Sequence, residues 1–178
     1  MNEILYRALC ACLGLTPSSA EASALIREAY QEPENAPRPP RSTDVIYYAL
    51  TPDESAQVIP QSYTAENPQS HTHKISVSAF SVWKLLLVCY GPHAADNARR
   101  IRAFLYLDGA GFPRSILRKA GLYPVPSPPE PLILREPEGS LWRLRADLTV
   151  SLYTAETQTH PARRNAVTAA PAVILHHE

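Results

Sequence analysis

The clearest hydrophobic pattern lies between Trp142 and Leu152, where apolar residues occupy every even position and polar residues stand between them. A period of two is typical of a β-strand with one buried and one solvated face. We expect Arg143 and Arg145 to face solvent or a subunit contact. The even-numbered side chains expected in the core are Trp142, Leu144, Leu148, Val150 and Leu152.

A second pattern joins a strand to a helix. Leu85–Tyr90 is apolar throughout, which predicts a strand covered on both faces, and Gly91-Pro92 ends it because proline cannot donate to a sheet and suits a first helical turn. Asp96 follows near the helix start, where a negative charge is favoured. Apolar residues then recur at helical spacing, at Ala94, Ala98, Ile101 and Leu105.

The remaining elements follow from shorter signals. Helices are predicted over Asn2–Leu13, which Gly14 ends, and over Pro113–Ala120, which Gly121 ends. Strands are predicted over Val45–Leu50, His73–Tyr90 and Leu132–Leu134, with a turn at Thr51–Glu54 and a hairpin through Pro137 and Gly139. This order predicts an α+β fold, a largely antiparallel mixed sheet with helices packed on one face.

Eighteen prolines, about twice the usual ~5%, are clustered rather than scattered. One cluster stiffens a link over Gln31–Thr43 and another lies over Pro124–Pro131. Such links serve as solvated spacers, or in a ring they lie across a neighbouring subunit. The end of the chain is polar after Thr154 and then apolar near Ile174. It either docks on its own domain or adds to the sheet edge of a neighbour.

Charge and cysteine content narrow the class of protein. Seventeen basic and seventeen acidic residues cancel, so nothing favours coating of nucleic acid. Cys10, Cys12 and Cys89 have no metal or redox spacing and are expected to be buried, reduced thiols. No apolar run reaches the ~20 residues of a membrane span and no secretory signal is recognised, so synthesis in the cytoplasm is expected.

The sequence offers little that points to catalysis. His71 and His73 are two residues apart, but no third ligand stands at a metal-binding spacing. Gly109-Ala110-Gly111 lacks the Lys-Ser/Thr of a phosphate loop and is expected to be a turn. No serine or cysteine lies in a nucleophile motif. We therefore expect no enzyme, no catalytic residue, no metal and no cofactor.

One segment resembles a known family. The run Tyr90-Gly91-Pro92, followed by Ala95, Asp96, Asn97 and Ala98, is similar to a phrase found in the neck or tail-terminator proteins of tailed bacteriophages. Ile26–Gln31 with Asn35–Pro39, and Val45–Pro52, fit that family in the same order, so the resemblance covers about residues 24–153. It favours a strand over Ala24–Gln31. Ser18 and Glu21 keep a second helix open, because they have the spacing of a capping box.

The resemblance implies a structural virion protein of the bacteriophage neck or tail. Such proteins form a ring, typically a hexamer, that caps the tail tube and joins the head connector or a head-completion protein, while DNA passes through the lumen without specific binding. We expect a single tail-terminator-like domain over residues 1–153 and a C-terminal extension or arm over 154–178. Residues expected at the subunit interface are Arg99, Arg100, Arg102, Pro37, Arg38 and Pro39.

Two other functions remain open at this stage. A head-completion or connector adaptor has the same size and ring habit. A small cytoplasmic binding module or enzyme, with a pocket between sheet and helices, is the alternative from another class. No membrane partner is expected for any of them.

Overall fold

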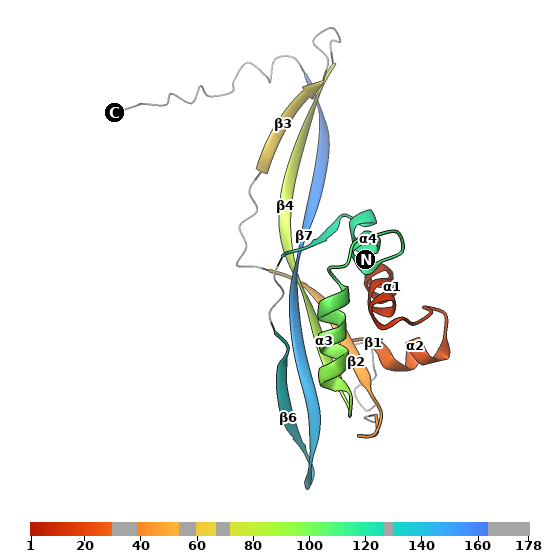
Figure 1. The fold of residues 1–178 in the computed structure, drawn as a ribbon. Coiled ribbons are helices and arrows are strands. Elements are labelled where there is room, and N and C mark those ends of the chain that lie inside the picture. Colours follow the sequence, from red (N-terminus) through yellow and green to blue (C-terminus); the bar gives the residue numbers. More distant parts are fainter. Residues whose placement is uncertain (30–38, 54–59, 67–71, 127–129, 164–178) are drawn as a thin grey trace. The chain divides into compact units, whose positions relative to one another are not determined.

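The computed structural model describes residues 1–29, 39–53, 60–66, 72–126 and 130–163 (Figure 1). The chain forms two compact units, Met1–Ala56 with Ser81–Thr154, and Gln57–Phe80 with Ala155–Glu178. Two long strands, β4 (Thr72–Tyr90) and β7 (Leu141–Arg163), contribute to both units. The candidate site lies in the first unit.

The first unit contains a sheet in which the strand order is β1-β2-β4-β7-β5, with β6 also paired to β7. The remaining strands are β1 (Ile26–Glu28), β2 (Val45–Pro52), β5 (Leu122–Pro124) and β6 (Leu132–Glu138). Strand β1 pairs with β2 in parallel, whereas β2 pairs with β4, and β5 and β6 pair with β7, in antiparallel registers. The predicted mixed and mostly antiparallel sheet is confirmed.

Helices of the first unit cover one face of this sheet (Figure 1). They are α1 (Asn2–Leu13), α2 (Ala20–Leu25), α3 (Ala94–Phe104) and α4 (Pro113–Lys119). Their apolar side chains form one core with alternate residues of the central strands, which confirms the predicted α+β fold. Fully buried members include Leu5, Leu9, Ile46, Leu85, Leu87, Ile101, Leu117, Leu148 and Leu152.

Helix α1 has the predicted bounds. Gly14 ends it in the left-handed conformation with φ 71°, and its backbone N–H reaches the carbonyls of Ala11 and Cys10. Helix α4 also matches the prediction and begins with Pro113 in its first turn. The three cysteines are free and buried, as expected. Burial raises the pKa of the Cys12 and Cys89 thiols to about 12.

The strand predicted over Ala24–Gln31 is partly wrong. Ala24 and Leu25 belong to α2, and the strand β1 is confined to Ile26–Glu28 within the described residues. Ser19, not Ser18, caps α2, because its Oγ accepts a hydrogen bond from the Ala22 N–H at 3.1 Å. The helix that the capping-box spacing left open is therefore present, one residue later.

The strand β7 follows the predicted alternation, but its first residues depart from the expected burial. Leu148, Val150 and Leu152 are buried, as predicted. Trp142, expected in the core, is 64% exposed, and Arg143, expected to face solvent or a subunit contact, is only 6% exposed within the single subunit. The hairpin of β6 and β7 extends past the start of α3 (Figure 1). Trp142 is the second residue of β7, next to the hairpin turn, which agrees with its exposure.

The predicted coverage of β4 on both faces is also wrong. Leu85, Leu87 and Cys89 are buried under the helices, whereas Leu86 and Val88 are only half-buried on the opposite face. Strand β2 continues to Pro52, through the first part of the turn expected at Thr51–Glu54. Similarly, Pro137 lies in β6, and the hairpin turn is Gly139-Ser140.

In the second unit, β3 (Pro60–Glu66) pairs in antiparallel register with Lys74–Ala79 of β4. The single long strand predicted over His73–Tyr90 is therefore confirmed, while β3 was not predicted. The predictions for Pro37, Arg38 and the apolar end near Ile174 lie outside the described residues. No helix in the described part of the chain is long and apolar enough to cross a membrane.

Candidate functional site

The Tyr-Gly-Pro segment lies where β4 passes the start of β2. Gly91 has φ 111°, and a Cβ at this position would lie 2.7 Å from the Cα of Asp44. The carboxylate of Asp44 accepts a hydrogen bond from the His93 backbone N–H at 2.9 Å and contacts the ring Nδ1 at 2.8 Å. Asp44, the residue just before β2, therefore pairs with the backbone at the start of α3, while Asp96 lies in the first turn of that helix.

The contact with Asp44 also changes the titration of His93. The hydrogen bond from the ring to Asp44, followed by the negative charge of that carboxylate, raises the pKa of His93 above its usual value. Asp96 adds a smaller effect in the same direction. This segment is therefore a structural corner that fixes α3 against β2.

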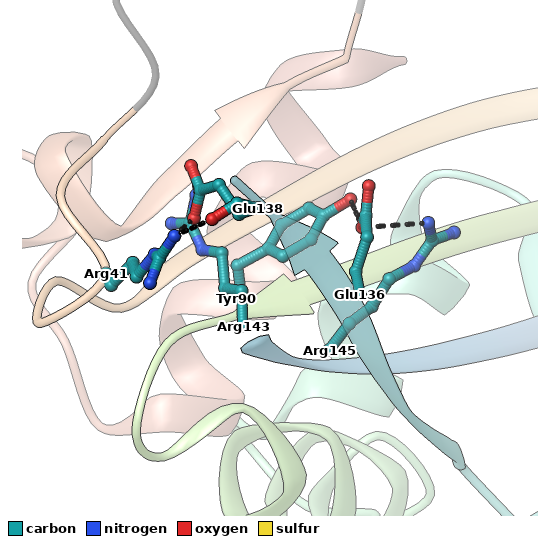
Figure 2. Close-up of polar contacts among 6 residues, drawn as sticks. All are labelled: Arg41, Tyr90, Glu136, Glu138, Arg143 and Arg145. Atoms are coloured by element: carbon teal, nitrogen blue, oxygen red, sulfur yellow. Dashed lines mark hydrogen bonds and ion pairs between the residues drawn. The ribbon is translucent and has the colours of Figure 1, made fainter. Parts of the chain in front are cut away.

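Tyr90 points to the helix-free face of the sheet, where it belongs to a polar cluster (Figure 2). The other members of this cluster are Arg41, Glu136, Glu138, Arg143 and Arg145. Its hydroxyl donates to Glu136 at 2.9 Å, and the Arg145 guanidinium reaches the same carboxylate at 3.3 Å. Arg145 also donates to both oxygens of Asp147, at 2.7 and 2.9 Å. Burial, then the hydrogen bond to Glu136, raises the pKa of Tyr90, so its hydroxyl stays a donor.

Arg143 lies at the centre of this cluster. Its guanidinium carbon is 4.8 Å from the centroid of the Tyr90 ring, within the range of a cation–π contact. Its Nη1 is 4.0 Å from Glu138, a carboxylate that Arg41 already holds at 2.9 Å. Among the described residues, Nε and Nη2 of Arg143 and Nη1 of Arg41 are buried without a hydrogen-bond partner.

The cluster borders a cleft of about 360 Å³ on the helix-free face. The cleft combines apolar walls with convergent charged groups, the usual anatomy of a recognition site. Among the described residues that line it, no nucleophile lies beside a base, and the converging charged side chains are suited to binding a partner. Its lining residues are Ala29, Pro39, Tyr47, Val88, Tyr90, Glu136, Pro137, Glu138, Arg143 and Arg145.

The hairpin of β6 and β7 adds exposed apolar surface beside the cleft. Leu132 is 60%, Leu141 61% and Trp142 64% exposed. The odd-numbered residues of β7, including Leu141, share the face of Arg143. Leu132 and Leu134 lie on this face too, because they pair with Asp147 and Arg145. Exposed apolar groups around a polar centre are typical of a protein contact surface.

The three arginines predicted at the interface have different environments on α3. Arg99 is exposed and pairs with Asp96 at 3.4 Å. Arg100 is exposed and lies 5.9 Å from the centroid of the Phe104 ring. Arg102 is partly covered and pairs with Glu130 at 2.8 Å. Their place in a subunit interface stays a prediction.

The structure brings one predicted interface residue, Pro39, to the cleft, and one family-motif residue, Tyr90. Ala98 is buried in the core, while Pro92 and Asp96 are exposed. Sequence reasoning missed Arg41, Glu136 and Glu138. The signal available was the alternation of Glu136 and Glu138 on β6, which the hairpin places beside the arginines of β7.

Among the described residues, no group of three or more His, Cys, Asp or Glu could hold a metal ion. The side chains of His71 and His73 lie outside the part that the structure describes. The pKa of Arg145 is raised, chiefly by the hydrogen bond to Asp147. Its guanidinium therefore remains charged.

Comparison with protein families places the chain among the structural proteins of bacteriophage virions. The chain belongs to the phage neck terminator protein family, whose model matches residues 1–173. Membership implies a place in the neck of the virion and assembly with other head or tail proteins. No curated protein sequence matches the chain.

Proposed function

We propose that the protein caps the tail tube as a ring of identical subunits and joins it to the head connector or a head-completion protein. The observation that carries this proposal is the family match over residues 1–173. Capping by a ring stops addition of tail-tube subunits at one end and presents a new surface to the head. DNA passes through the lumen of the ring without specific binding.

Ring formation requires two different complementary surfaces on each subunit, related by a rotation that closes. The first unit offers distinct surfaces of this kind, the charged helix α3 on one layer and the cleft with its apolar rim on the other. A net charge of zero agrees with a lumen that lets DNA pass, since strong phosphate binding needs an excess of Lys and Arg.

Deletion of the gene from its parent phage tests the proposal. Electron microscopy of the lysate should show tails of irregular length, or normal tails and filled heads that fail to join. A plasmid copy of the gene should restore normal virions. Normal virions from the deletion phage would contradict the proposal, and tails of correct length with leaking, unclosed heads would favour the connector-adaptor alternative.

A further inference from the structure

The unpaired atoms of Arg143 have a specific geometry. Its side chain is only 7% exposed, and the two buried atoms without a partner, Nε and Nη2, form one edge of the guanidinium plane. Two parallel N–H groups on one edge match the two oxygens of a carboxylate, which makes such pairs bidentate. A neutral acceptor would satisfy one of these donors and leave the other.

The neighbouring carboxylates do not fill this edge. Glu136 is bound by Tyr90 and Arg145, and Glu138 is bound by Arg41. The Nη1 of Arg143 lies 4.0 Å from the nearest oxygen of Glu138. A buried donor without a partner carries the cost of its lost hydration. Among the described residues, the Nε–Nη2 edge of Arg143 and the Nη1 of Arg41 therefore lack an acceptor. The acceptor for the Arg143 edge has to come from outside the described contacts of the cleft.

The surroundings favour a protein carboxylate over a small molecule. The cleft lies within exposed apolar residues on the same face of the hairpin, chiefly Leu132 and Leu141. A desolvated arginine inside an apolar rim is the usual composition of the energetic centre of a protein interface. A small anion would leave that rim in water.

We propose that the cleft binds an acidic side chain of a second copy of this chain, through the Nε–Nη2 edge of Arg143. The acceptors we assign are the carboxylates of Glu3 in α1 and Glu21 in α2, which are exposed and have no ion-pair partner in the described part of the chain. Because these helices and the cleft lie on opposite layers, the contact runs head to tail, as ring closure requires. The inference rests on the proposed function.

The chemistry of the cleft is tested on the purified full chain by nuclear magnetic resonance of the arginine Nε–H groups. Sodium acetate should shift the Arg143 signal, whereas sodium chloride of the same ionic strength should not. Arg143→Lys keeps the positive charge but removes the parallel Nε–H and Nη2–H groups. The arginine Nε–H signal that is missing from the spectrum of this variant is the signal of Arg143. Absence of an acetate-specific shift would overturn a carboxylate site.

The source of the carboxylate is tested by complementing the gene-deleted phage with plasmid-encoded variants. Arg143→Lys should lower the yield of joined virions at least about tenfold, the effect of ~1.4 kcal/mol on a binding constant. Arg135→Lys, an exposed arginine on the other face of the same hairpin, should leave the yield unchanged. Thermal unfolding of the purified variants confirms that both remain folded.

The acidic partner is identified in the same assay. Glu3→Gln or Glu21→Gln should lower the yield to the same extent, and combining it with Arg143→Lys should add nothing, because the two changes remove one interaction. Loss with Arg143→Lys but with neither glutamate variant would overturn the second copy as the source. Abnormal tails from the uncomplemented deletion phage would still support the proposed function in that case.

Discussion

Gly91 lies where two backbones pass too closely for a side chain. A Cβ there would meet the Asp44 Cα at 2.7 Å and the Thr43 carbonyl at 2.8 Å, and the φ of 111° disfavours any L side chain. Gly91→Ala should lower the free energy of unfolding by about 1–2 kcal/mol for the backbone, and by about 1–3 kcal/mol more for the overlap. Chemical denaturation measures this loss.

Gly121 provides the matched control for that substitution. It also has a positive φ, of 73°, but nothing lies within 4 Å of its added Cβ. Gly121→Ala should therefore cost only the backbone contribution of about 1–2 kcal/mol. Equal losses for the two variants would show that the close approach to Asp44 is not what requires glycine at position 91.

The His93–Asp44 pair predicts a pH dependence. The pKa of His93 in the folded state is raised above 6.5. The stability that the protonated His93 ring contributes is therefore fully present below about pH 6.5, and it is lost as the pH rises through the folded-state pKa. A titration followed by nuclear magnetic resonance should give a pKa above 6.5 for His93. Asp44→Asn should return that pKa towards 6.5, and Asp96→Asn should lower it much less. An unshifted pKa in the wild-type protein would contradict the pairing.

At the scale of an element, β7 separates residues that stabilise the fold from residues available to partners. Leu148 is 1% exposed in the core, so Leu148→Ala should lower the free energy of unfolding by about 2–5 kcal/mol. Trp142 is on the same face of the strand but beyond the helices, so Trp142→Ala should change it by no more than about 0.5 kcal/mol. Denaturation with urea distinguishes the two, and a large loss for Trp142→Ala would show that the hairpin is packed in solution.

The same strand shows how far the sequence could predict the fold. Period-two alternation correctly placed Leu148, Val150 and Leu152 in the core, because alternation is a local property of a strand. It could not predict that the helix layer ends before Trp142. It also could not predict that Tyr90, which is distant in sequence, would cover Arg143.

Helix α2 and the cleft illustrate the same limit. The polar residues before Ile26 allowed either a helix or a strand, and tertiary contacts decide between them in so short a segment. The polar cluster at the cleft collects Arg41, Tyr90, Glu138 and Arg143 from separate segments, so no motif along the chain describes it. The Tyr-Gly-Pro segment was recognisable only because its glycine and proline shape the chain locally.

At the scale of the whole molecule, the net charge is zero, but the charged residues are unevenly distributed over the surface. The helix α3 carries three exposed charged residues, Asp96, Arg99 and Arg100, whereas the charges of the cleft largely neutralise one another. Exposed ion pairs contribute little to folding, so the arginines of α3 are available for contacts in assembly. The exposed charges of α3 can therefore serve subunit contacts in a ring without being needed for the stability of the fold.

Charge reversal on α3 tests this separation in the assembled phage. Arg99→Glu with Arg100→Glu should leave thermal unfolding nearly unchanged, because both side chains are exposed. It should weaken ring closure if α3 lies at the subunit interface, because reversing two charges there replaces attraction to the neighbouring subunit by repulsion. Complementation of the deletion phage by this double variant should therefore give tails of irregular length or tails without heads.

The matched control, with an equal change of charge, is Arg114→Glu with Lys119→Glu, two exposed residues of α4. Normal virions from the α3 variant would remove these arginines from the interface, and equal defects from both variants would indicate a general effect of net charge.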